Sequence, residues 1–216
     1  MNRQGDSGHE GRRAGKRAVV VEPPGSISIA AVAAHPDDIE SWCAGTLAQA
    51  VDAGATVRLL LVTSGDKGSD ERAATSEDVM ATRERETIAA ARLLGFAEVA
   101  FLRHPDGEVE DTRALRGQLV SCIRRWRPAA VFTHDPVHSF PAYLCHRDHR
   151  VVGRAVLDAV YPLARDRRSF PEHISEGLEL HAVDDVWLFA SAAAEVLVDI
   201  SAGFARKVEA RLAHQS

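Results

Sequence analysis

The sequence predicts an α/β fold, a Rossmann-like three-layer sandwich with a mainly parallel sheet in a single domain. Apolar runs of strand length alternate along the chain with helical patterns of crossover length, and no internal repeat is visible. Such alternation is typical of right-handed crossovers that cover both faces of a parallel sheet. Polar clusters directly follow several apolar runs, as expected where strands end at a ligand-binding edge. A length of 216 residues favours one domain with one sizeable core.

The N-terminal residues predict a tail rather than a helix or strand. Residues 1–25 are rich in Gly, Arg and Ser and close with Pro-Pro-Gly. This composition buries too little apolar surface to offset the entropy lost on ordering. We therefore expect a disordered tail over residues 1–25 and a folded domain over residues 26–216.

Two apolar runs and the segment between them predict the first βαβ unit. SISIAAVAA (26–34) is apolar or small at nearly every position, as in a buried strand. IESWCAGTLAQAVDAG (39–54) repeats apolar residues at spacings of three and four and stops at Gly54, which indicates one helix. TVRLLLVTS (56–64) is the second strand, and the turn-prone GDKGSD closes it.

The clearest helix covers DVMATRERETIAAARLLG (78–95). Its apolar residues predict a core-facing side made by Ile88, Ala91 and Leu94 or Leu93, and its final glycine is a common helix stop. The remaining pattern continues the alternation. It predicts strands at 98–102 and 129–133 around a helix at 112–126, a helix at 149–163 broken at Pro162, strand-like runs at 186–190 and 195–200, and a final helix from 202.

The composition narrows the possible classes of protein. No run of about 18 apolar residues exists, so no segment should span a membrane. The short apolar stretch near the N-terminus has no small-residue cleavage site after it, so we expect a cytoplasmic protein. A net charge of −5 with scattered arginines argues against a nucleic-acid partner. Three cysteines without CxxC spacing favour neither disulfides nor a thiolate zinc site. The sequence also leaves open whether the protein forms a homo-oligomer.

AHPDDIE, residues 34–40, places one histidine and three carboxylates where the first strand ends. Crowded carboxylates repel and raise one another's pKa, so a positive charge is expected among them, and a divalent cation would supply it. His35 and Asp38 are three positions apart, which brings both side chains to one side of a turn entering a helix. The carboxylate of Asp37 is then left free. Pro36 stiffens the turn through its fixed φ.

A second cluster, CHRDH at residues 145–149, offers the ligand that the first cluster lacks. Catalytic zinc usually takes three protein ligands and keeps one position open for water. CHRDH follows a strand and a loop and precedes a helix, so it should also project over the strand ends. A His/His/Asp zinc site with an unliganded carboxylate nearby would acidify the bound water and provide a base for its proton. The two clusters therefore predict metal-assisted hydrolysis, with zinc or another divalent ion.

AHPDDIE, TSGDKGS, the RERETIAAARLLG helix and HRDH together resemble the LmbE-like family, also called the PIG-L or GlcNAc deacetylase family. The resemblance extends from residue 28 to the AHQS at the end of the sequence. It implies a zinc-dependent N-deacetylase, which removes acetyl from a small amino-sugar conjugate of the N-acetylglucosamine type.

Carried over to this chain, the resemblance makes His35, Asp38 and His149 the zinc ligands. It makes Asp37 the general base that acts on zinc-bound water. His146 would stabilise the oxyanion or protonate the leaving amine.

Two further roles follow from the same resemblance. Asp148 would orient His146. Asp66 would contact the sugar, at a position where the family often has the longer glutamate.

Other interpretations of these residues stay open. The carboxylates of AHPDDIE could cap a solvated helix N-terminus. Cys145 beside His146 could be a nucleophile if a nearby base lowered its pKa. His134 and His138 fit no position of the two motifs and are expected to be loop residues. His104 in RHPDG resembles a second HPD element but is expected in a turn before Gly107.

The alternatives at the level of function are of two kinds. One is hydrolysis of an amide in another small conjugate, such as a thiol conjugate, which substrate profiling separates from deacetylation of an amino sugar. The other is a non-catalytic sugar-binding relative, which would bind zinc and sugar without turnover.

Overall fold

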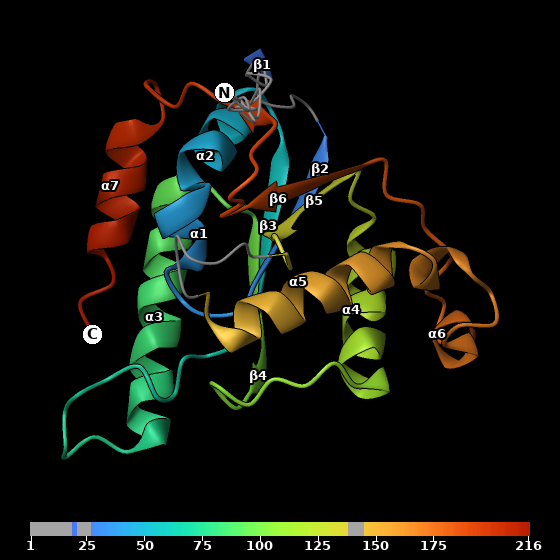
Figure 1. The fold of residues 1–216 in the computed structure, drawn as a ribbon, viewed down its shortest axis with the longest axis horizontal. Coiled ribbons are helices and arrows are strands. Elements are labelled where there is room, and N and C mark those ends of the chain that lie inside the picture. Colours follow the sequence, from blue (N-terminus) through green and yellow to red (C-terminus); the bar gives the residue numbers. More distant parts are fainter. Residues whose placement is uncertain (1–18, 21–26, 138–144) are drawn as a thin grey trace, which may run out of the picture.

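The computed structural model describes residues 19–20, 27–137 and 145–216, and its central sheet has five strands that are all parallel. The spatial order is β4-β3-β2-β5-β6 (Figure 1). The strands are β2 (Ser28–Ala33), β3 (Thr56–Thr63), β4 (Glu98–His104), β5 (Ala130–His134) and β6 (Asp185–Phe189). The predicted α/β class with a mainly parallel sheet is confirmed.

Helices cover both faces of this sheet, as Figure 1 shows. On one face lie α1 (Asp38–Trp42), α2 (Ala44–Asp52), α3 (Ser76–Leu94) and α7 (Phe204–Leu212). On the other lie α4 (Arg113–Trp126) and α5 (Arg147–Val160). Each face has its own apolar core, because successive strand residues point to opposite sides. Ile29 of β2 packs in the first core and Val32 in the second.

Several short elements complete the described part of the chain. η1 (Leu163–Arg165) and α6 (Pro171–Ser175) follow α5. β1 (Val19–Val20) pairs in parallel with β7 (Val196–Leu197), and the pair forms a separate two-stranded sheet. Among the described helices, none combines the length and the apolar character that crossing a membrane would need.

The helix predicted over 39–54 is in fact two helices. α1 and α2 meet at Cys43, whose φ of −132° and ψ of 4° end the first helix. Directly after this break, Gly45 packs so closely on Ile200 that a Cβ would meet its side chain at 2.9 Å. The break thus lies beside a close contact with a residue far away in the sequence, and the local hydrophobic pattern does not mark it.

Three other predictions differ from the structure in part. Ala91 and Leu94 of α3 are buried as predicted, but Ile88 and Leu93 are 36% and 43% exposed. The strand-like run at 195–200 forms only β7, outside the central sheet. Of the predicted tail, only the two residues of β1 belong to the described part of the chain.

The strand order determines where the two motifs meet. The chain leaves β2 toward β3 and β4 on one side, whereas β5 and β6 lie on the other side of β2. Such a reversal of strand order is a topological switch point, and ligands of open parallel sheets bind outside the carboxyl ends of the strands there. AHPDDIE follows β2 at this point, and the HRDH motif opens α5, which packs on β5 and β2.

Helix α5 lies so close to β5 that its position depends on a glycine. A Cβ on Gly153 would lie 2.4 Å from the carbonyl oxygen of His134 at the end of β5. We expect Gly153→Ala to lower the free energy of unfolding by about 1–3 kcal/mol, the usual cost of overpacking, although alanine has the higher helix propensity. Chemical denaturation would measure this loss.

Gly117→Ala in α4 is the matched control, because both glycines are helical and gain the same propensity. At Gly117 a Cβ would meet the ring of Phe170 at 2.9 Å, and a side chain can move where a backbone carbonyl cannot. We expect a smaller loss in this variant. Equal losses in the two variants would contradict a rigid contact between α5 and β5.

Candidate metal centre

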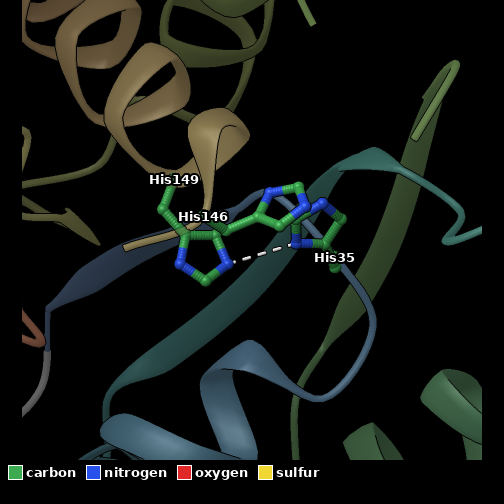
Figure 2. A group of neighbouring side chains, drawn as sticks. All are labelled: His35, His146 and His149. Carbon is green, nitrogen blue, oxygen red and sulfur yellow. Dashed lines mark hydrogen bonds between the residues drawn. The ribbon is translucent and has the colours of Figure 1, made fainter. Parts of the chain in front are cut away.

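The end of β2 and the start of α5 bring the two sequence clusters together. The backbone N–H of His35 donates to Asp38 Oδ2 at 2.8 Å, which folds the AHPDD turn over the strand end. His146 is the N-cap of α5, and His149 lies in its first turn. Figure 2 shows the imidazoles of His35, His146 and His149 converging from these two segments.

The three predicted metal ligands lie within reach of a single ion. His35 Nδ1 is 3.2 Å from His149 Nε2. His149 Nε2 is in turn 3.0 Å from Asp38 Oδ1. His35 Nδ1 is 3.6 Å from Asp38 Oδ2. Tetrahedral zinc, with bonds of about 2.0–2.1 Å, separates its ligand atoms by about 3.3 Å. Both the spacing and the set of two imidazoles and one carboxylate therefore fit a divalent ion such as zinc.

Further donors surround these three residues. Three overlapping groups have ligand atoms that all lie within 4.8 Å of one another, namely His35, His146 and His149; Asp38, His134 and His149; and His35, Asp106 and Asp148. Each group shares a residue with another group. The described donors thus form one continuous centre rather than separate sites.

Carboxylates dominate the charge around His35. Burial alone would lower the pKa of His35, but hydrogen bonds with Asp106, Asp148 and Asp38 raise it to about 11. Its Nε2 lies 3.1 Å from Asp106 Oδ1 and 3.3 Å from Asp148 Oδ2. An ion at Nδ1 would leave the Nε2–H group to donate to these carboxylates, which is how a metal-binding histidine is usually oriented.

Asp38 is ionised despite its burial. Burial would raise the pKa of Asp38, but the charge and hydrogen bonds of His134, His149 and His35 hold this pKa well below its usual range. The carboxylate is therefore already in the anionic form that a metal ligand requires.

Asp37 directly precedes the ligand Asp38 in the chain, and its carboxylate takes no part in capping the helix. The residue is the N-cap of α1 with φ 77°, in the left-handed region, and makes no side-chain capping hydrogen bond. Such backbone strain in a non-glycine residue is concentrated at functional sites. Burial, and then the charge of Asp38, raise the pKa of Asp37, as suits a base that must accept a proton. The capping interpretation is therefore wrong for Asp37.

His146 is exposed at the edge of the centre. One hydrogen bond determines which of its two ring nitrogens carries the proton when the ring is neutral. Its Nδ1 accepts from the backbone N–H of Asp148 at 3.2 Å, so the ring proton lies on Nε2. Burial, and then the charge of His35, lower the pKa of His146. A neutral ring with a free Nε2–H group can donate a hydrogen bond to developing negative charge.

Asp148 uses its carboxylate on a different histidine from the one predicted. The side chain is fully buried, lies 3.3 Å from His35 Nε2 and accepts from the backbone N–H of Gly107 at 2.7 Å. Its backbone N–H donates to His146 Nδ1, and the charge of its carboxylate also raises the pKa of His146. The carboxylate thus orients His35, and its predicted role toward His146 stays a prediction.

Two residues of the centre were not singled out as site residues from the sequence. His134, at the end of β5, is 1% exposed, stacks on His149 with ring centroids 4.1 Å apart and lies 3.2 Å from Asp38 Oδ2. The expectation that His134 is a loop residue is wrong, and its place at the end of a predicted strand was the available signal. Asp106 comes from the turn after β4, where RHPDG repeats the HPD of the first motif.

The other predicted residues lie at the rim of the centre or away from it. Asp66 Oδ1 accepts from the backbone N–H of Asp106 at 2.9 Å, so Asp66 supports the turn that carries Asp106. The expectation that His104 lies in a turn is wrong, because it is the last residue of β4, where it contacts Gln118 at 2.7 Å. His138 lies outside the described residues. Burial raises the pKa of the Cys145 thiol, which is the opposite of what a nucleophilic cysteine needs.

Comparison with known proteins finds relatives across most of the chain. The profile of the family described as GlcNAc-PI de-N-acetylase (PIG-L) matches residues 30–160. The chain is 30% identical over 182 residues to the diacetylchitobiose deacetylase of Thermococcus kodakarensis, covering 84% of this chain and 67% of the relative. It is 29% identical over 167 residues to the mycothiol S-conjugate amidase of Streptomyces coelicolor, covering 68% of this chain and 55% of the relative.

A solved structure is similar over nearly the same length. The N,N'-diacetylchitobiose deacetylase from Pyrococcus horikoshii superimposes with a TM-score of 0.81 at 25% identity, covering 87% of this chain and 69% of that one. All three similar proteins carry the names of enzymes that cleave amide bonds. The chain spans only about half the length of the amidase.

Proposed function

Because this chain belongs to the PIG-L family of de-N-acetylases, we propose that it hydrolyses the acetamide group of a small N-acetylglucosamine-type conjugate. The resemblance inferred from AHPDDIE and HRDH is confirmed by the family match over residues 30–160. The predicted class, an amide-cleaving hydrolase, is that of the named relatives. A cytoplasmic location and the absence of a nucleic-acid partner stay predictions.

The observation that carries this proposal is the meeting of the two motifs. His35 Nδ1 and His149 Nε2 lie 3.2 Å apart, and each lies within 3.6 Å of one of the two carboxylate oxygens of Asp38. Asp37, the residue before Asp38, has an uncapped carboxylate. These three residues would hold the metal, for which zinc is the first choice. When bound, zinc supplies a Lewis acid that polarises the amide carbonyl and makes a nearby water more acidic.

The protein's own groups would perform the proton transfers. Asp37 takes the proton of the attacking water, and its raised pKa suits this step. The Nε2–H group of His146 donates to the oxyanion that forms as the carbonyl carbon becomes tetrahedral. The proton held by Asp37 is then available to the leaving nitrogen, so that free amine and acetate are released.

The test is acetate release from N-acetylglucosamine and N,N'-diacetylchitobiose, measured together with the free amine. We expect equal amounts of both products, loss of activity after metal removal by a chelator, and recovery on addition of zinc. Elemental analysis of the stripped protein is the control. Deacetylation that continues in protein shown to be free of metal would contradict the mechanism, and binding of zinc and sugar without turnover would favour a non-catalytic relative.

A second candidate rests on the similarity to the mycothiol S-conjugate amidase. That enzyme's name indicates cleavage of an amide in a thiol conjugate, which the same metal centre could perform. The ratio of kcat/KM for a thiol-conjugate amide to that for an acetylated amino sugar decides between the two. A ratio above one would mean that the amide of the thiol conjugate, and not the acetamide of the amino sugar, is the preferred substrate.

A further inference from the structure

The carboxylate of Asp37 is held by a residue from the far end of the chain. Asp37 Oδ2 pairs with Nη2 of Arg211 at 3.2 Å, and Arg211 lies near the end of α7. We propose that α7 is a positioning element for the general base, with Arg211 fixing the orientation of the Asp37 carboxylate. This inference rests on the proposed function, in which Asp37 takes a proton from water.

The local structure leaves Asp37 in need of such support. Its side chain is 28% exposed and makes no capping hydrogen bond, and α1 has only five residues. An unsupported aspartate at such a place can rotate among several rotamers. A base must instead lie within hydrogen-bond reach of the proton that it takes. The ion pair with Arg211 restricts this rotation.

Helix α7 is itself fixed on the helix that carries Asp37. Lys207 Nζ donates to the carbonyl oxygens of Glu40 at 2.5 Å and Ser41 at 2.7 Å, both in α1. At the start of α7, Gly203 approaches Gly45 so closely that a Cβ would lie 2.4 Å from its carbonyl oxygen. The helix therefore cannot slide along α1 without losing these contacts.

The residues just after α7 fix its C-terminal end as well. His214 Nε2 lies 3.7 Å from Oε1 of Glu40, too far for a hydrogen bond, and both side chains are almost completely buried. The backbone N–H groups of Gln215 and Ser216 donate to Oε1 of Glu86 in α3, each at 3.1 Å. Glu40, the acidic residue of AHPDDIE with no role in the proposed mechanism, thus packs against the segment beyond Arg211. Arg211 lies between two anchored points.

An ion pair as exposed as that of Arg211 contributes little to stability. Arg211→Met should therefore fold normally, yet lower kcat by about 10- to 100-fold, the scale on which small misplacements of catalytic groups act. KM should change little, because Arg211 contacts the base and not the substrate. Arg211→Lys, which keeps the charge, should recover part of the kcat.

Arg206→Met is the matched control for a merely structural role. Arg206 lies on the same helix and pairs with Asp52 and the carbonyl oxygen of Ala48, so its loss loosens α7 without touching Asp37. We expect near wild-type kcat in this variant. A double-mutant cycle provides the second readout, because Arg211→Met should have no further effect when added to Asp37→Ala.

The outcomes separate this inference from the proposed function. If wild-type protein releases acetate but Arg211→Met and Arg206→Met lose activity equally, α7 has no specific role in positioning and the inference fails alone. A rise in KM at constant kcat, or a further loss on top of Asp37→Ala, would overturn it in the same way. If metal-loaded wild-type protein cleaves none of the amides, the proposed function fails and the inference fails with it.

Discussion

Asp37→Asn is expected to lower kcat for acetate release by about two to four orders of magnitude, the scale on which a general base acts. Asparagine has nearly the same shape but cannot take up a proton at neutral pH. Metal content should stay at the wild-type level, because Asp37 is not among the three proposed ligands. The measurement is kcat under saturating substrate, together with metal analysis of the same preparation.

Stability separates this role of Asp37 from a structural one. The residue has φ 77° and no capping hydrogen bond, and asparagine tolerates the left-handed region better than most residues. Asp37→Asn should therefore unfold at the same denaturant concentration as the wild type or at a higher one. Asp70→Asn, in the exposed loop after β3, is the control for a change of charge. A destabilised Asp37→Asn with kcat within a factor of ten of wild type would refute the role as base.

Most of the fold could be predicted because strand and helix patterns are local. Runs such as 26–34 and 56–64 are mostly apolar, which indicates strands buried on both faces, and their order along the chain indicated the parallel sheet. The break at Cys43 was not predicted, because the apolar residues recur at helical spacing on both sides of it. The exposed side of α3 was also missed, since Ile88 continues the apolar period but lies away from the core.

The centre itself was predictable only where a motif marked it. The sequence pointed to His35 and Asp38 through their spacing and to His149 through family resemblance, and the structure brings these three residues together. Asp106 was missed because its place depends on an irregular register between β3 and β4. This register shifts between Leu61 and Thr63, and Arg103 near the end of β4 has φ 57°. No hydrophobic pattern reports such an irregularity.

Asp106 and Asp38 should affect metal binding to different degrees, because they lie on opposite sides of the His35 ring. Asp38 faces Nδ1 and His149, where the ion would bind, whereas Asp106 faces Nε2 at 3.1 Å. Loss of a carboxylate that only orients a metal-binding histidine costs about 10- to 100-fold in metal affinity. We expect a loss of that size for Asp106→Asn. For Asp38→Asn, which removes a direct ligand, we expect a loss above about 100-fold.

Competition with a chromophoric chelator would measure both affinities on zinc-loaded protein. Asp66→Asn is a useful third variant, because Asp66 holds the turn of Asp106 through a backbone hydrogen bond and does not contact His35. It should therefore weaken zinc binding less than Asp106→Asn does. Equal losses for Asp38→Asn and Asp106→Asn would mean that the ion binds His35 through Nε2, between Asp106 and Asp148. In that case His149 would not be a ligand, and His149→Ala would retain zinc.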